Sequence, residues 1–201
     1  MKGKTTTPYY RKRSIMSNIG VIHGRFQVLN MKQMEYILAA KMRCRKLYLG
    51  ITHPDIVNFA ATSTLDTSGI TKKDNPMTFF ERYEMLLNVF EEFKIKREDF
   101  EIIPFPISQP DLLRGYIPVT ATYYMSIITP WDKERLRTLE LLGLKTEVIW
   151  EKKESELGVT GKDIRQMIAD GNSNWRLHVP KSVSEYIINK QIDLRIRQLN
   201  S

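Results

Sequence analysis

Cysteine and long apolar runs are scarce in this sequence of 201 residues. Cys44 is the single cysteine, so the chain cannot form an internal disulfide and cannot supply a cysteine-type metal site by itself. No run of about 18 or more apolar residues is present, and no apolar segment follows the basic start, which indicates neither a membrane span nor a secretory signal. We therefore expect a cytoplasmic protein that has no membrane partner.

Acidic residues are missing from the first thirteen positions, which hold five basic side chains. The formal net charge of the chain is +8, so the remaining sequence is only mildly basic. A nucleic-acid-binding protein would spread its positive charge over a folded surface, and nucleic acid is therefore not an expected partner. We expect residues 1–17 to form a basic flexible tail and residues 18–201 to form one folded domain.

Short β-rich runs alternate with longer amphipathic segments along this domain. The predicted strands are residues 19–23, 46–52, 100–107, 122–129 and 146–150. Apolar residues at helical spacing predict helices over residues 31–41, 79–90 and 131–142, and Thr78 with Glu81 forms a capping box before the second of them. This order of elements predicts an α/β fold with a doubly wound parallel sheet, followed by helices at the C-terminal end of the chain.

The turn after the first predicted strand is the place to look for a ligand, because such sheets bind ligands beyond the carboxyl ends of their strands. Hydrogen-bond donors gather there at the start of a helix, and this arrangement suits a phosphate: Arg25, Gln27, Asn30, Lys32 and Gln33. A simpler interpretation makes Asn30 the N-cap of the helix and places Lys32 and Gln33 in its solvated first turn.

Four segments resemble the signature motifs of one enzyme family, in that family's order. The first, GRFQVLNMKQ (24–33), is similar to the G-R-F-Q-P-F-H-x-G-H signature of nucleotidyltransferases related to nicotinamide-nucleotide adenylyltransferase, within the cytidylyltransferase-like (HxGH) superfamily. The others are NPMTFFER (75–82), VTGKDIRQMI (159–168) and NWRLHVPKSV (174–183), which are similar to N-P-F-T-x-x-E-R, S-G-T-E-I-R-R-x-M and W-x-x-L-V-P-x-x-V. The resemblance covers residues 18–201 and implies a Rossmann-like nucleotidyltransferase domain.

The resemblance also implies a reaction. A nucleoside monophosphate, in the first interpretation AMP from ATP, would pass to a phosphorylated small molecule such as NMN, with release of pyrophosphate and a place in NAD biosynthesis. Mg²⁺ would arrive with the nucleoside triphosphate, and the sequence predicts no metal site of the protein's own. A homo-oligomer is also expected. In-line attack on the α-phosphorus needs positioned donors more than a nucleophile.

Candidate site residues follow from the matched motifs and from position. Arg165 would be a charged fork on the β- and γ-phosphates and would act in catalysis with Asn30 and Gln33. Nucleotide contacts are predicted for Gly24, Arg25, Phe26, Gln27, Lys32, Thr160, Gly161 and Lys162. The candidates for the acceptor substrate are His53, Arg114 and Trp131, the last as a stacking ring.

The first motif departs from the family pattern at three positions. Asn30 and Gln33 stand where the family has histidines, and Lys32 stands where it has glycine. Amides donate hydrogen bonds but cannot become positively charged, and a lysine takes up space that a glycine leaves free. Two alternatives therefore remain open: a cytidylyltransferase that acts on a phosphorylated or phosphonate small molecule, and a nucleotide-binding homologue with impaired catalysis and a binding or regulatory role.

Overall fold

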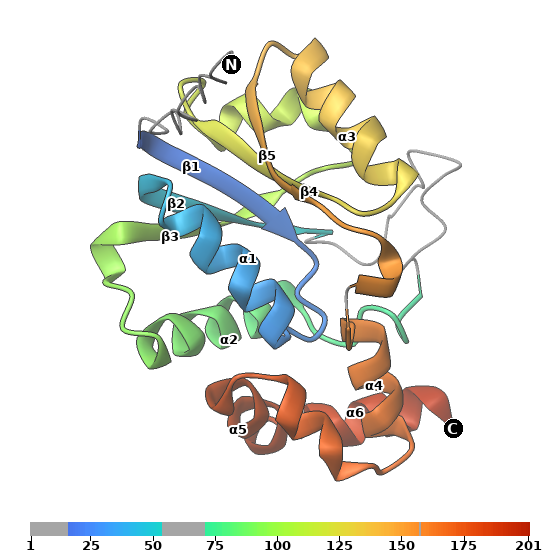
Figure 1. The fold of residues 1–201 in the computed structure, drawn as a ribbon. Helices are drawn as coiled ribbons and strands as arrows, with labels where there is room; N and C mark the ends of the chain where they lie inside the picture. Colours follow the sequence, from blue (N-terminus) through green and yellow to red (C-terminus); the bar gives the residue numbers. More distant parts are fainter. Residues whose placement is uncertain (1–15, 54–70, 157) are drawn as a thin grey trace, which may run out of the picture.

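The computed structural model describes residues 16–53, 71–156 and 158–201. Five parallel strands form one sheet in the order β3-β2-β1-β4-β5 (Figure 1). The strands are β1 (Ser17–Gly24), β2 (Cys44–Thr52), β3 (Phe100–Phe105), β4 (Thr122–Ile127) and β5 (Lys145–Glu151). The predicted doubly wound parallel sheet is confirmed. The predicted tail lies almost wholly outside the described residues, as does the segment 54–70.

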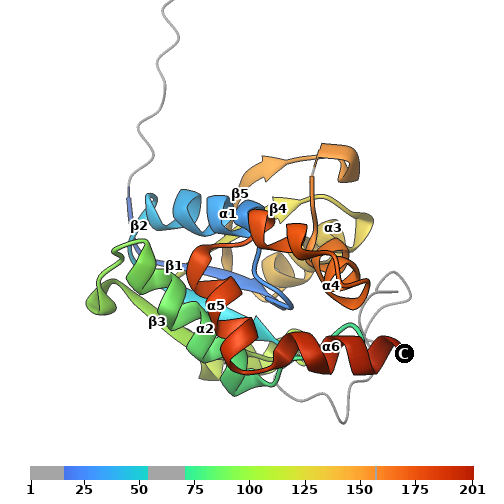
Figure 2. The same cartoon turned by 90° about the horizontal axis from the view of Figure 1, so that it is seen from below.

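The helices cover both faces of the sheet. They are α1 (Met31–Lys41), α2 (Phe79–Glu92), α3 (Pro130–Leu141), α4 (Gly161–Ala169), α5 (Lys181–Asn189) and α6 (Ile192–Asn200). Apolar residues of α1, α2 and the three C-terminal helices share one core with one face of the sheet, whereas α3 packs with the other face in a second core (Figures 1 and 2). Helices α1 and α3 therefore lie on opposite faces.

The central strands β1, β2 and β4 carry runs of buried residues that face both sides of the sheet, as their nearly continuous apolar runs predict. Val21 and Ile22 are neighbours in β1 and belong to the two different cores. Gly50 in β2 lets the Phe105 ring lie directly on the strand, because a Cβ at Gly50 would stand 2.3 Å from that ring. Phe105 in turn stacks on His23 of β1, with 4.6 Å between the ring centroids. This packing fixes the carboxyl ends of β1, β2 and β3 against one another.

Capping boxes begin four of the helices. The predicted pair Thr78 and Glu81 caps α2, and equivalent pairs stand at the starts of α1, α3 and α4. Helices that follow parallel strands begin at the carboxyl edge of the sheet, so the positive ends of their dipoles gather there.

In Figure 1 the C-terminal helices α4, α5 and α6 lie together below the sheet. Helix α5 packs on α2, and α6 packs on α4 and α5 (Figure 2). Arg195 of α6 forms two hydrogen bonds of 2.8 Å with the Glu81 carboxylate and a third with the Pro76 carbonyl. Within the described ranges, every helix is too short or too polar to cross a membrane.

Candidate functional site

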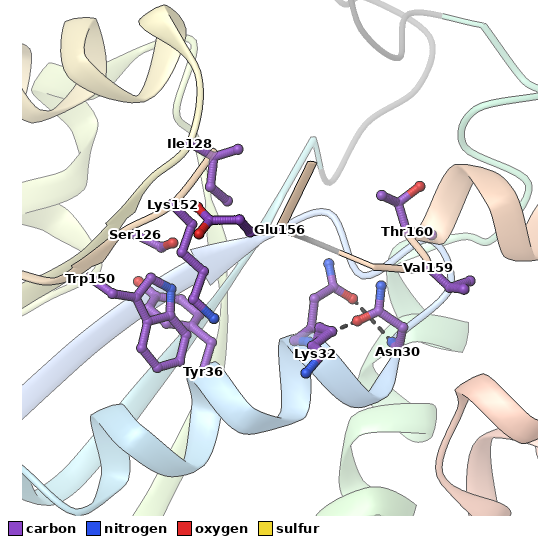
Figure 3. A pocket seen from close by; sticks show the side chains of 12 residues that line it. Asn30, Lys32, Tyr36, Ser126, Ile128, Trp150, Lys152, Glu156, Val159 and Thr160 are labelled. Carbon is purple, nitrogen blue, oxygen red and sulfur yellow. Dashed lines mark hydrogen bonds between the residues drawn. The ribbon is translucent and has the colours of Figure 1, made fainter. Parts of the chain in front are cut away.

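A pocket of about 200 Å³ opens at the carboxyl edge of the sheet, where the strand order reverses between β1 and β4. Helices α1 and α4 begin on one side of it, and the ends of β4 and β5 form the other side (Figure 3). Its lining consists of Asn30, Lys32, Gln33, Tyr36, Ser126, Ile128, Trp150, Lys152, Glu156, Val159, Thr160 and Gly161. The structure thus brings together residues of the first and third sequence motifs.

Asn30 and Gln33 face this pocket with their amide groups in a defined orientation. The Asn30 Oδ1 accepts from the Gln33 backbone N–H at 2.7 Å, and the Gln33 Oε1 accepts from the Asn30 backbone N–H at 3.2 Å (Figure 3). Asn30 is therefore the N-cap, as the simpler interpretation predicts. Because the oxygens are used by the cap, the NH₂ groups of both side chains are the ends left for a ligand. No hydrogen bond from either NH₂ group to another described residue is found.

The start of α4 lies directly against the turn that follows β1. A Cβ at Gly161 would stand 3.1 Å from the Val28 carbonyl oxygen and 3.2 Å from that of Gln27, so only glycine allows this approach without a shift. Thr160 caps α4 through the Asp163 backbone N–H. Thr160 and Gly161 line the pocket, whereas Lys162 is exposed on the first turn of the helix. Two helix N-termini therefore meet at one cavity.

Lys32 also lines the pocket. Its Nζ lies 2.9 Å from Glu35 Oε1, and both side chains are half exposed. The Lys32 side chain therefore points along the helix surface toward Glu35, which leaves the amides of Asn30 and Gln33 accessible from the cavity.

The remaining residues of the turn build its shape. Phe26 is buried with a left-handed backbone (φ 51°), and a Cβ at Gly24 would meet the Phe26 ring at 3.0 Å. The Gln27 side chain is buried and pairs with the Met77 backbone, donating to its carbonyl at 2.8 Å and accepting from its N–H at 2.9 Å. Gln27 thus fastens the turn to the segment before α2, and its amide is engaged within the protein.

Arg165 reaches the same turn from α4. Its guanidinium donates to the carbonyls of Gln27 and Gly161 and to Asp74, and the side chain is buried. Burial lowers the pKa of Arg165, the charge of Arg25 lowers it further, and Asp74 opposes both. Arg165 is therefore placed beneath the predicted phosphate region, with its donors directed to protein atoms in this conformation.

Arg82 is the last residue of the second sequence motif, and the sequence predicts no role for it. It is fully buried in α2 and donates to the carbonyls of Thr78, Arg25, Thr52 and His53. Burial lowers its pKa to about 10, and Arg25 adds to that effect. The charge of Arg25 therefore acts on two buried guanidinium groups, so positive charge gathers at this edge of the sheet.

Aromatic and polar residues that the sequence analysis did not select form the other end of the pocket. Trp150, at the end of β5, lies 5.6 Å from the Tyr36 ring, and the Lys152 Nζ stands 4.3 Å above the Trp150 ring (Figure 3). The Tyr36 hydroxyl donates to the Tyr124 carbonyl at 2.7 Å, and burial raises its pKa. The Ser126 hydroxyl is buried with no hydrogen-bond partner among the described residues. The sequence feature that could have indicated this end of the pocket is Trp150, which is the last residue of the predicted strand 146–150.

The three acceptor candidates do not line this pocket. The His53 carbonyl accepts from Arg82, which places His53 at the end of β2. Arg114 donates to the Leu142 carbonyl, beyond the C-terminal end of α3 and close to the start of β5. Trp131 lies in the first turn of α3 and lines a different cavity.

Metal ligands do not cluster in the part of the chain that the structure describes, where no three His, Cys, Asp or Glu side chains come together.

Comparison with known proteins adds one clear relative. The sequence is 38% identical over 182 residues to a phosphonoformate cytidylyltransferase from Streptomyces viridochromogenes, and the match covers 90% of this chain and 97% of that protein. No protein-family model matches the sequence.

Solved structures show the same fold. A bifunctional NMN adenylyltransferase/ADP ribose pyrophosphatase from Francisella tularensis has a TM-score of 0.61 at 16% identity, over 92% of this chain and 54% of that chain. The chain therefore spans about half the length of this bifunctional protein. A Plasmodium falciparum nicotinic acid mononucleotide adenylyltransferase complexed with NaAD has a TM-score of 0.52 at 12% identity, over 88% of this chain and 97% of that chain.

Proposed function

The chain belongs to the cytidylyltransferase-like superfamily of nucleotidyltransferases, and from this premise we propose that it transfers CMP from CTP to a small phosphonate or phosphorylated acceptor and releases pyrophosphate. The relative that is 38% identical over nearly its full length supports the choice of CTP and of a phosphonate acceptor such as phosphonoformate.

The single observation that carries the proposal is the meeting of two helix N-termini at one pocket. Free backbone N–H groups at the starts of α1 and α4 favour anions, and the NH₂ groups of Asn30 and Gln33 add two more donors at the same place. A triphosphate held there would have donors aimed at the charge that develops during transfer. Neutral amides in place of imidazoles make the site weaker electrostatically, and the nearby arginines compensate in part.

The base of the nucleotide would occupy the aromatic end of the pocket. Trp150 offers a ring face, and the unpartnered Ser126 hydroxyl offers a hydrogen bond to the edge of a base. The pocket is about 200 Å³, which has room for a pyrimidine ring.

The residues that bind the nucleotide would also perform the reaction. An oxygen of the acceptor would attack the α-phosphorus in line, the bond to the β-phosphate oxygen would break, and pyrophosphate would leave. Arg165 would contact the β- and γ-phosphates after releasing Asp74, and Arg25 would lie beside it. Mg²⁺ would enter as part of the substrate, bound to the triphosphate, where it neutralises phosphate charge.

AMP transfer from ATP to NMN is the second candidate. It draws on the motif resemblance, and the adenylyltransferase structures with this fold are consistent with it. A nucleotide-binding homologue with impaired catalysis is the third, because the first motif lacks both histidines.

Pyrophosphate release in the presence of Mg²⁺ tests these proposals. CTP and ATP are each combined with phosphonoformate, with NMN or with no acceptor, and Arg165→Ala serves as the blank. We expect release that requires CTP and phosphonoformate together and is lost in the blank. Release that requires ATP and NMN would support the second candidate instead. If no pair reacts, calorimetric titration of CTP and ATP decides whether the chain still binds nucleotide, and absence of binding would contradict all three.

A further inference from the structure

A second cavity lies on the opposite face of the sheet from the nucleotide pocket. It measures about 280 Å³ and is enclosed by α3 and by the segment that follows β3. Its lining includes Ser108, Trp131, Glu134 and Arg135, with Leu139 deeper along the helix. Trp131 stands one turn after the end of β4, so the cavity begins at the same carboxyl edge as the nucleotide pocket.

Arg135 lies on α3, the helix that follows β4, and β4 also lines the nucleotide pocket through Ser126. Arg135 lines the cavity beside α3, yet its charge also lowers the pKa of Tyr36, which lines the nucleotide pocket and whose pKa burial raises. The same charge lowers the pKa of His23, after the larger effect of burial. Asp132, the ion-pair partner of Arg135, opposes its effect on Tyr36.

Two polar atoms of these residues have no hydrogen-bond partner within the described ranges. They are Arg135 Nε and His23 Nε2, and both are buried. Arg135 uses one Nη for the Asp132 carboxylate, and its guanidinium lies 5.6 Å from the Trp131 ring centroid. A buried guanidinium N–H without an acceptor is costly, and a ligand carboxylate that accepts from it removes that cost.

We infer that the α3 cavity binds the acceptor, and that Arg135 holds a carboxylate group of that acceptor while its phosphonate or phosphate points toward the nucleotide pocket. This inference rests on the proposed transferase function. A small molecule with both groups spans the switch point, so its phosphonate oxygen reaches the α-phosphorus. Glu134 also lines the cavity and Asp132 pairs with Arg135, so these two acids favour a singly charged carboxylate over a second phosphate.

Ligand truncation tests this assignment. Phosphonoformate has a carboxylate where methylphosphonate has a methyl group. Each ligand is titrated calorimetrically into wild type, Arg135→Gln and Arg137→Gln. The titrations are done in EDTA, both with and without CTP. Arg137 is the matched control, because it is an exposed arginine on the same helix. We expect Arg135→Gln to weaken phosphonoformate binding at least tenfold and to leave methylphosphonate binding unchanged, while Arg137→Gln behaves as wild type.

Three results would overturn the inference: equal phosphonoformate affinity in wild type and Arg135→Gln, an equal loss for both ligands, or no binding of phosphonoformate to wild type under either condition. Thermal melts of each variant exclude misfolding. If Arg135→Gln is unstable, Arg135→Lys replaces it in the test; it keeps the charge and should retain part of the affinity for phosphonoformate. Because the titration needs no turnover, absence of pyrophosphate release with intact phosphonoformate binding would contradict the proposed function and leave the site standing.

Discussion

Arg165 of α4 donates from Nη2 to Oδ1 of Asp74 at 3.2 Å, and this ion pair joins the start of α4 to the segment that leads into α2. The two other acceptors of the guanidinium are backbone carbonyls, so Asp74 is the only carboxylate that accepts a hydrogen bond from it among the described residues. A carboxylate at this position resembles a phosphate oxygen in charge and geometry. Asp74 and a bound triphosphate would therefore compete for Arg165.

The first prediction concerns this competition. Asp74→Asn removes the charge and keeps the size, so the nucleotide no longer has to displace an ion pair. Partly exposed pairs of this kind contribute about 0.2–1 kcal/mol, which corresponds to an increase in CTP affinity of up to about fivefold. Calorimetric titration measures it. Weaker CTP binding in Asp74→Asn than in wild type would instead mean that Asp74 positions Arg165 for the ligand.

The second prediction compares two arginines of the same region. Arg165→Ala should weaken nucleotide binding more than Arg25→Ala, because Arg165 also holds the α4 terminus against the Gln27 carbonyl. Arg165→Lys separates the two contributions, since lysine keeps the charge but cannot form the fork. Titration with CTP and a thermal melt are measured for each variant. Equal affinities for wild type and Arg165→Ala would contradict the predicted phosphate site.

The third prediction separates the capping role of Asn30 from its role toward a ligand. Asp is as good an N-cap as Asn and is favourable at the positive end of a helix, so Asn30→Asp should keep or raise the melting temperature. The carboxylate replaces a donor and repels phosphate, so CTP affinity or turnover should fall at least about tenfold. Asn30→Ser keeps the cap without adding charge, so its CTP affinity should lie between those of wild type and Asn30→Asp. Unchanged CTP binding in Asn30→Asp would show that this amide does not touch the nucleotide.

The parts of the fold that were predicted from sequence depend on local patterns. Buried parallel strands are continuous apolar runs, and the Thr78 and Glu81 capping box marks the start of α2, so the elements and their order were recognisable. The motif resemblance also predicted that residues 24–33 and 159–168 contribute to one site. Apolar runs, capping boxes and motifs are all properties of short stretches, so they can be recognised in a single sequence.

The parts that were not predicted depend on contacts between distant segments. Tyr36 and Trp150 meet only because β5 pairs with β4 and α1 turns one face toward them. Arg82 binds three carbonyls from two other segments as well as one at the start of its own helix, and carbonyls carry no side-chain signal. Gln27 has a residue type that suits a phosphate, but its partner is the Met77 backbone fifty positions away.

The fourth prediction tests the aromatic end of the nucleotide pocket. Trp150→Ala removes the ring on which the base would lie, and stacking of a base on an aromatic side chain contributes about 1–3 kcal/mol, or roughly 5- to 150-fold in affinity. Trp150→Phe should restore most of it. The control is Trp131→Ala, which should leave CTP affinity unchanged because Trp131 lines the other cavity. Equal losses in the two alanine variants would argue against a base site at Trp150.

The last prediction concerns the ion pair that fastens α6 to the start of α2. Burial raises the pKa of Glu81, but hydrogen bonds from Arg195 and Thr78 outweigh burial and leave this pKa below its ordinary value. A carboxyl group whose pKa is lower in the folded state stabilises the protein above its unfolded pKa, and this stabilisation is lost as the pH falls through the folded pKa.

Arg195→Met removes the main cause of that shift. At neutral pH the variant should lose about 1 kcal/mol of the free energy of unfolding, because the pair is bidentate but partly exposed. Between about pH 6 and about pH 3 wild type should lose more stability than the variant, so the two curves converge in acid. Urea unfolding across this range measures it, with Arg137→Met as the control for removal of an exposed arginine. Parallel curves for wild type and Arg195→Met would show that Glu81 does not link the C-terminal helices to stability in this range.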